Sequence, residues 1–106
     1  MKTPLTFLQR VDELIEAHPA HSDMLGFLST QLELSTSQIY RKIKRKTGRS
    51  PSLYVRHKRL EMAKVLIEQS DLTVTEISER VGFRQLSYFS RCFSTYFGVS
   101  PSSFRK

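Results

Sequence analysis

Hydrophobic residues recur every three or four positions along most of this 106-residue chain, and no stretch alternates with a period of two. The first such stripe consists of Phe7, Leu8, Val11, Leu14 and Ile15. Its spacing follows the 3.6-residue turn of an α-helix, whereas a half-exposed β-strand would alternate at every second residue. The pattern therefore predicts an all-α protein of about seven helices.

Polar and proline residues mark where the first two helices should begin. Thr3 before Pro4 is typical of an N-cap followed by the proline tolerated at the first helical position. The first helix is then expected to end near residues 18–19. A second helix should begin at Ser22 and end near residues 33–34. Its apolar positions are Leu25, Leu28 and Leu32.

Two further helices should begin at capping boxes, in which a Ser or Thr side chain and a Glu or Gln three residues later satisfy each other's backbone N–H groups. Ser35 and Gln38 form one such pattern, before a helix expected to reach about residue 46. Thr73 and Glu76 form the other, before a short helix ended by a glycine. The apolar positions of these helices are Ile39, Ile43, Ile77 and Val81.

The same stop and start signals then occur twice. Residues 47–54 read TGRSPSLY, and residues 97–104 read FGVSPSSF. In both, a Gly stops one helix and a Ser-Pro pair opens the next. A long helix is expected over residues 51–69, with an apolar side formed by Leu53, Leu60, Ala63 and Ile67. The helix before the second stop carries a stripe of Phe89, Phe93 and Phe97.

The two halves of the chain resemble each other. A shift of fifty residues places Ser37 on Ser87 and Arg41 on Arg91, and upstream of these pairs the shift is forty-nine. Each copy reads as a short helix, a turn, a longer helix and a Gly stop, which is the helix-turn-helix pattern. Such units also occur as plain packing modules, so it is their repetition that favours nucleic-acid binding.

The repeat divides the chain into four parts. Residues 1–21 form an N-terminal helix that packs on the first unit, and residues 22–50 form the first helix-turn-helix unit. Residues 51–70 form a linker helix, and residues 71–106 form the second helix-turn-helix unit. Eighteen residues of linker helix would measure roughly 27 Å. That length nearly bridges the spacing of about 34 Å between successive major grooves on one side of DNA.

The positive charge is concentrated in one segment. The chain carries a net charge of +7, and residues 41–66 hold ten Lys or Arg against Glu61 alone. A solvated helix face usually mixes its signs, so a block of one sign indicates a polyanionic partner. Charge alone leaves nucleic acid, an acidic lipid surface and an acidic protein open.

Other classes of function find little support in the sequence. No apolar run approaches the roughly 18 residues of a membrane span, and the charged start MKTPLTFLQRVDEL does not read as a secretory leader. Cys92 is the only cysteine, which fits a cytoplasmic setting and a packing role. His18 and His21 lack further ligands of a zinc site, and neither a P-loop nor a nucleophile elbow is present. We expect no enzyme activity, no cofactor and no metal.

Two long segments carry a family resemblance. LELSTSQIYRKIKRKTGRSPSLYVRHKRLEMAKVLI followed by VTEISERVGFRQLSYFSRCFSTYFGVSPSSFRK resembles the DNA-binding domain of the AraC/XylS family of bacterial transcription regulators. The resemblance covers about residues 22–106. The first half, with SQIYRKIK and a preceding helix such as TFLQRVDELIEA, is similar to versions that end hybrid two-component sensor proteins. One departure is Glu33, where the family commonly has a small residue or glycine.

The resemblance implies two helix-turn-helix units on a linker helix, one in each of two adjacent major grooves. It implies that the partners are double-stranded DNA, RNA polymerase and a sensing or dimerisation domain elsewhere in a longer chain, with no membrane contact by this segment. We expect the chain to be an excised output domain, or a short member of the family that relies on partners.

Base edges in the major groove are read by side chains on the outward face of a recognition helix. The recognition helices are expected at about residues 36–46 and 86–97. The base-reading candidates are Ser37, Tyr40, Arg41, Lys44, Leu86, Ser87, Ser90 and Arg91. Arg41 is the foremost of these in the first helix because its fork matches two acceptors on guanine, and Arg91 mirrors it. The candidates for phosphate contact are Lys42, Arg45, Lys46, Arg49 and Arg84.

Plainer interpretations stand beside these. The cap role alone explains Gln38, and Arg91 could pair with a nearby acid. The phenylalanine stripe at steps of four is typical of a core, although it could stack on single-stranded bases. Three linker residues could contact the DNA backbone or lie in solvent: Arg56, Lys58 and Arg59. The alternative function is an architectural or protein-interaction module that uses residues 41–66 without reading sequence.

Overall fold

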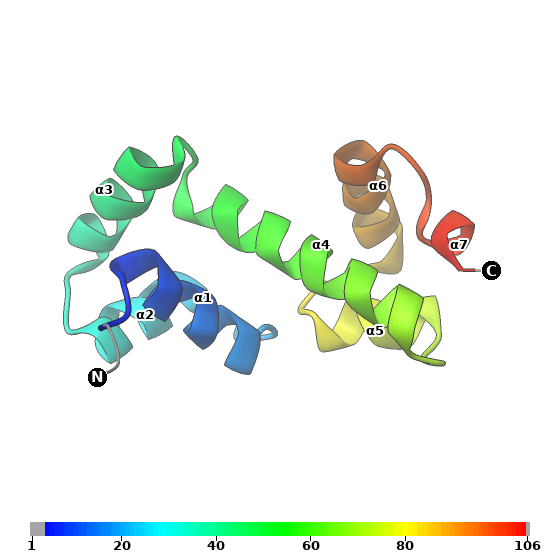
Figure 1. The fold of residues 1–106 in the computed structure, drawn as a ribbon, viewed down its shortest axis with the longest axis horizontal. Helices are drawn as coiled ribbons and strands as arrows, with labels where there is room; N and C mark the ends of the chain where they lie inside the picture. The colour runs from blue at the N-terminus through cyan, green and yellow to red at the C-terminus, as the bar shows by residue number, and fades with distance from the viewer. Residues whose placement is uncertain (1–3, 106) are drawn as a thin grey trace. The chain divides into compact units, whose positions relative to one another are not determined.

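The computed structural model describes residues 4–105, and within this range the chain forms seven α-helices and no β-strand (Figure 1). The helices are α1 (Phe7–Ala17), α2 (Met24–Leu32), α3 (Thr36–Thr47), α4 (Pro51–Gln69), α5 (Val74–Arg80), α6 (Leu86–Phe97) and α7 (Pro101–Phe104). The prediction of an all-α fold with about seven helices is confirmed.

The helices belong to two compact units, Met1–Val55 and Arg56–Lys106. The first contains α1, α2, α3 and the start of α4, and the second contains the rest of α4 with α5, α6 and α7. In each unit a short helix and a longer one follow each other across a tight turn, as α2 and α3 do in the first and α5 and α6 in the second. The finer division at residues 21, 50 and 70 stays a prediction.

The first unit is held by aliphatic packing among its four helices. Burying a side chain of the size of Val, Leu, Ile or Met contributes about 1.5–3 kcal/mol to the stability of the folded state. The buried residues are Val11, Ile15, Met24, Leu28, Leu32, Ile39, Ile43, Tyr54 and Val55. The helical spacing of apolar positions in the sequence correctly predicted most of this core.

The second unit has a core rich in aromatic rings. Phe89 and Phe93 are fully buried, with ring centroids 5.8 Å apart, and Phe97 is partly buried on the same side of α6. Phe104 of α7 packs edge-on against Phe93 at 5.6 Å. Cys92 is partly buried against this cluster, as expected. The phenylalanine stripe is therefore core, which removes it as a platform for stacking on bases.

Helix α1 begins later than the sequence analysis predicted. Thr6 caps the helix, because its Oγ1 accepts a hydrogen bond from the N–H of Gln9 and the Gln9 side chain accepts one from the N–H of Thr6. This capping box sets the start at Phe7, so the prediction that Pro4 is the first helical residue is wrong. Thr3 lies outside the described residues.

Helix α2 also begins later than predicted. The carboxylate of Asp23 accepts a hydrogen bond of 3.1 Å from the N–H of Gly26, which makes Asp23 the N-cap and Met24 the first helical residue. Ser22 is therefore not the start of the helix. Aspartate and serine are equally good N-cap residues. Asp23 is the N-cap here because it directly precedes Met24, whose side chain is buried in the core.

The other start and stop signals are confirmed. Ser35 with Gln38 and Thr73 with Glu76 both form complete capping boxes. Both long helices of the repeat, α3 and α6, end at a glycine in the left-handed region, Gly48 with φ 74° and Gly98 with φ 82°. These signals depend on groups only three or four residues apart, so they set the helix ends independently of the tertiary structure.

The turns of the two units differ at one position. Glu33, between α2 and α3, has φ 55°, and Gly82, its counterpart between α5 and α6, has φ 103°. Glu33 is the only residue other than glycine with a positive φ in the part of the chain that the structure describes. A left-handed conformation costs a residue with a side chain about 1–2 kcal/mol. Glu33, where a glycine is common in the resembling family, therefore lowers the stability of the folded state.

Arg105, which follows α7, is bonded to the C-terminal end of α4. The guanidinium group of Arg105 donates hydrogen bonds to the carbonyl oxygens of Leu72, Ser70 and Ile67. Carbonyls at a helix end have no partner within the helix, so a side-chain donor there satisfies an otherwise open requirement. Arg105 thereby belongs to the fold of the second unit.

Candidate nucleic-acid interface

One face of α3 carries exposed polar side chains. Ile39 and Ile43 are fully buried, and the intervening residues turn outward because successive helix positions rotate by about 100°. All four predicted base-reading residues of this helix are exposed: Ser37, Tyr40, Arg41 and Lys44. The capping box at Ser35 holds the start of the helix, so these side chains project from an ordered segment.

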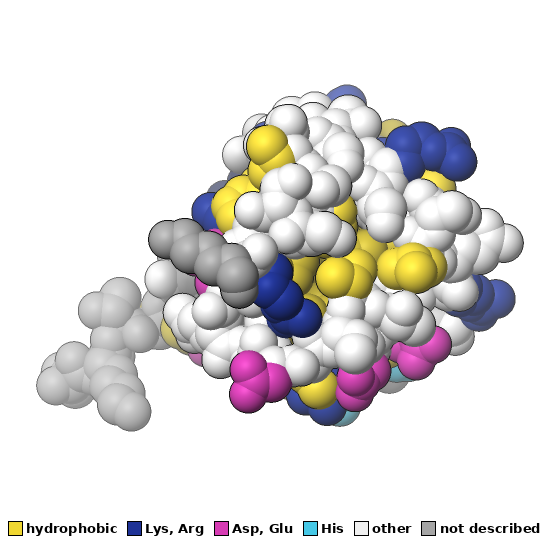
Figure 2. Space-filling view, turned by 90° about the vertical axis from the view of Figure 1, so that its right-hand side faces the viewer, with side chains coloured by type: hydrophobic (Ala, Val, Ile, Leu, Met, Phe, Trp, Pro, Cys, Tyr) yellow, Lys and Arg dark blue, Asp and Glu magenta, His cyan; other side chains and the backbone are white. Residues whose placement is uncertain are grey.

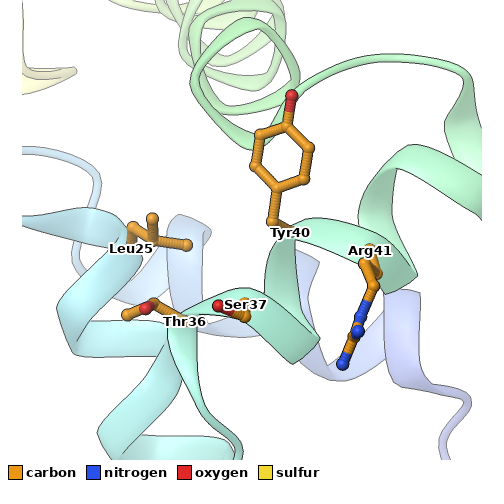
Figure 3. A pocket seen from close by; sticks show the side chains of 5 residues that line it. All are labelled: Leu25, Thr36, Ser37, Tyr40 and Arg41. Carbon is orange, nitrogen blue, oxygen red and sulfur yellow. The ribbon is translucent and has the colours of Figure 1, made fainter.

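An open pocket lies beside this face. It has a volume of about 380 Å³, and its lining residues are Leu25, Thr36, Ser37, Tyr40 and Arg41. Figure 3 shows the ring of Tyr40 and the guanidinium group of Arg41 extending from α3 in opposite directions, with Leu25 reaching in from α2. The sequence analysis missed Leu25, because its spacing assigned it to the apolar side of its helix.

Two of the cations on α3 also serve the fold. The ammonium group of Lys44 donates a hydrogen bond of 3.2 Å to the carbonyl oxygen of Gly48 at the end of the helix. The ammonium group of Lys42 lies 5.5 Å from the ring centroid of Phe7 on α1. Cations near a helix C-terminus also stabilise its dipole. The remaining predicted phosphate contacts of this unit are exposed: Arg45, Lys46 and Arg49.

Helix α6 presents a comparable face in the second unit. Leu86, Ser87 and Arg91 are exposed, whereas Ser90 is partly buried. Arg84, the predicted phosphate contact in the preceding turn, is exposed as well. Within residues 4–105 neither Arg41 nor Arg91 has a carboxylate within ion-pairing distance. The alternative that Arg91 pairs with a nearby acid therefore finds no partner in the described chain.

The three linker cations are neither fully exposed nor fully buried. The Nη1 atom of Arg56 donates a hydrogen bond of 2.7 Å to the hydroxyl of Tyr88 on α6, within the second unit. Burial lowers the pKa of the Arg59 guanidinium group, which remains charged at neutral pH because an arginine normally titrates far above it. Lys58 is partly buried too. The sequence analysis named these residues but missed Tyr88.

The face that carries α7 is not basic. Figure 2 shows hydrophobic side chains in the middle of this face, Asp and Glu along one edge, and Lys and Arg at scattered points. A surface that binds a polyanion gathers cations. The face that carries α7 does not gather cations in this way (Figure 2).

His18 and His21, the two histidines considered for a zinc site, pack on an aromatic ring. The rings of His18 and His21 lie 5.0 Å and 4.6 Å from the ring centroid of Phe27. Among the described residues no group of three His, Cys, Asp or Glu is placed to hold a metal ion. No helix in that part of the chain has the length and hydropathy to cross a membrane.

Comparison with known proteins decides which family this arrangement represents. A family model described as a helix-turn-helix domain matches residues 28–106, which is more than half of the chain. The chain belongs to the AraC-type helix-turn-helix family. The resemblance drawn from the sequence is thus confirmed. AraC-type domains are the DNA-binding domains of transcription regulators.

Curated relatives of this AraC-type domain are longer proteins. The Msm operon regulatory protein of Streptococcus mutans is 33% identical over 100 residues, which are 94% of this chain and 36% of that protein. Histidine kinase P4 of Formosa agariphila is 32% identical over an alignment of 100 residues that covers 92% of this chain and 7% of that protein. The chain thus spans about a third or less of these relatives.

A solved relative of the AraC-type domain contains nucleic acid. The DNA-binding domain of AdpA, a global transcriptional factor, was crystallised with a target DNA and aligns with a TM-score of 0.81 at 26% identity. The alignment covers 95% of this chain and 91% of the AdpA chain. The two chains therefore share the fold over nearly their whole lengths.

Proposed function

We propose that this chain binds double-stranded DNA sequence-specifically as the output domain of a bacterial transcription regulator. In this proposal α3 and α6 are the recognition helices and enter adjacent major grooves. The observation that carries it is the exposed face of α3, repeated in α6, where an arginine without an ion-pair partner among the described residues projects beside small hydroxyl side chains. The AdpA domain, which binds DNA with the same fold, supports it.

Each outward residue has a role that its chemistry suits. Arg41 and Arg91 would donate two hydrogen bonds to a guanine edge, and Leu86 would contact a thymine methyl. The hydroxyls and Lys44 would bond to bases or to the adjacent backbone. Phosphate contacts would come from exposed cations around the two helices: Lys42, Arg45, Lys46, Arg49 and Arg84.

Helix α4 would set the spacing of the two contacts. Its 19 residues correspond to a length of about 28 Å, compared with about 34 Å between successive major grooves on one side of a duplex. If the helix-turn-helix units do not extend far enough past the ends of α4 to span the remaining distance, the DNA has to bend toward the protein. The energy of bending depends on sequence and would add to specificity.

The wider setting follows from the lengths of the relatives. Because the chain spans a small part of each of them, we place it as one segment of a longer cytoplasmic regulator. A sensing or dimerisation domain would lie elsewhere in that protein, and the DNA-bound domain would act together with RNA polymerase. The similarity to a histidine kinase fits an output domain that ends a hybrid sensor.

Selection from random duplex DNA tests the proposal. The 106-residue chain is expected to enrich a motif of about 15–20 base pairs with two half-sites roughly one helical turn apart. Binding without any enriched motif would overturn the proposal in favour of an architectural module that uses residues 41–66. A motif with a single half-site would contradict the insertion of both helices into the duplex.

A further inference from the structure

A hydrogen bond joins Arg56 to Tyr88, an exposed tyrosine next to Ser87 in α6 of the second unit. Tyr88 follows Ser87 in α6 and is 40% exposed. Its ring lies 6.0 Å from that of Phe83 in the preceding turn. Its hydroxyl accepts the 2.7 Å hydrogen bond from Nη1 of Arg56 on α4. The side chain is therefore supported at both its ring and its hydroxyl while it remains open to solvent.

The first unit offers a comparison at the equivalent position. The counterpart of Tyr88 under the fifty-residue shift is Gln38, whose side chain accepts a 2.8 Å hydrogen bond from the N–H of Ser35 and caps α3. In α6 the N-cap residue Gln85 makes no side-chain capping bond. A capping role thus explains Gln38 but does not explain Tyr88.

The hydrogen-bonding capacity of the tyrosine is only half used. A phenol hydroxyl both donates and accepts, whereas a guanidinium group only donates. Arg56 therefore uses the accepting side of the Tyr88 oxygen and leaves the hydroxyl proton for a different acceptor. No acceptor for that proton is bonded to Tyr88 among residues 4–105.

We propose that Tyr88 is a further DNA-contacting residue of the second unit, donating its hydroxyl proton to an acceptor on the duplex, and that Arg56 is the residue that positions it. The acceptor is an oxygen or nitrogen of DNA, either of a phosphate or of a base edge. The inference rests on the proposed function and adds a donor that the sequence pattern did not reveal. It also reassigns Arg56, which would act through Tyr88 and not as a phosphate contact.

Binding measurements on four chains test this arrangement. The wild-type chain is compared with Tyr88→Phe, Arg56→Met and the double variant on the selected site and on a scrambled duplex. Tyr88→Phe should bind the selected site about three- to tenfold more weakly, the range of a single hydrogen bond. Its salt dependence should match that of the wild type, because no charge is lost. Arg56→Met should weaken binding by no more than this factor.

The double variant separates positioning from direct contact. If Arg56 acts through Tyr88, the double variant binds as Tyr88→Phe does. A further loss from Arg56→Met in the Tyr88→Phe background would show that Arg56 contacts DNA itself, and would overturn the positioning role. An equal loss on both duplexes identifies the acceptor as phosphate, and a loss confined to the selected site identifies it as a base.

A matched control removes another hydroxyl from the same helix. Tyr96 is partly buried and its ring lies 4.3 Å from that of His57, so Tyr96→Phe should leave DNA affinity unchanged. Thermal unfolding confirms that each variant is folded. Wild-type affinity for Tyr88→Phe would overturn this inference alone. A wild-type chain without sequence preference would overturn the proposed function, while the same comparison on either duplex still decides whether the Tyr88 hydroxyl contacts DNA.

Discussion

The hydroxyl of Tyr54 donates a 2.6 Å hydrogen bond to Oδ1 of Asp12 and so joins the start of α4 to α1 in the first unit. Tyr54 is only 9% exposed. Tyr54→Phe should lower the free energy of unfolding by about 1–2 kcal/mol, because a partly buried carboxylate loses a donor. Urea denaturation measures this change. Asp12→Asn is the control, since it keeps an acceptor and should cost less, and an unchanged midpoint in Tyr54→Phe would contradict the prediction.

Glu33→Gly should stabilise the chain. The substitution relieves a left-handed conformation that costs a side-chain residue about 1–2 kcal/mol, and the greater freedom of glycine in the unfolded chain takes back part of this gain. A net increase of about 0.5–1 kcal/mol in the free energy of unfolding is expected from denaturant titration. Gly82→Ala in the second unit is the mirror control and should destabilise. A loss of stability in Glu33→Gly would show that the carboxylate has a structural role.

Arg41→Ala and Arg91→Ala should each weaken binding to the selected site by roughly 1–3 kcal/mol. The loss should be much smaller on a scrambled duplex, because a base-reading side chain contributes to discrimination more than to general affinity. Titrations with single base-pair changes in the site would locate the position that each arginine reads. If both variants keep the full preference for the site, neither arginine is a base-reading residue.

Lys46→Ala should weaken binding to all duplexes by a similar factor. It removes one cation that is expected to neutralise a phosphate, so the slope of log affinity against log salt should fall by about one. Lys64→Met is a matched control, because this ammonium group lies over the rings of Phe97 and Phe104 and its loss should leave the slope unchanged. A sequence-dependent loss in Lys46→Ala would instead place this residue at a base.

The start of α5 should weaken in acid. Hydrogen bonds from the backbone and then the side chain of Thr73 lower the pKa of the Glu76 carboxyl, and the charge of Arg80 lowers it further. The stabilisation is therefore complete above the unfolded-state pKa of about 4.3 and is lost as the pH falls through the lower folded-state pKa.

The two capping boxes of the first unit provide an internal comparison, because they use Gln9 and Gln38, which do not titrate. An NMR titration should show the Thr73 amide signal moving in the acid range while those of Thr6 and Ser35 stay constant. Glu76→Gln should abolish the movement and flatten the dependence of stability on pH. A Thr73 signal that is insensitive to pH in the wild type would contradict this account.

What the sequence determined by itself was local. The capping box at Ser35, the helix stop at Gly48 and the buried Phe89 and Phe93 were predicted correctly, because each depends on groups within a turn or on the periodicity of one helix. The outward position of Arg41 follows from the same periodicity. Where two local signals competed, as Pro4 did with the capping residue Thr6, the sequence indicated the wrong start.

Only the tertiary structure decided which distant residues meet. Arg56 reaches Tyr88 across 32 positions, and Tyr54 reaches Asp12 across 42. No periodicity or cap connects such pairs, since their contact depends on how whole helices pack. The sequence therefore predicted two helix-turn-helix units and their exposed arginines. The hydrogen bond from Arg56 to Tyr88 of α6 and the one from Tyr54 to Asp12 of α1 were not predictable from the sequence. Contacts between residues so far apart in the chain are set by how the helices pack in each core.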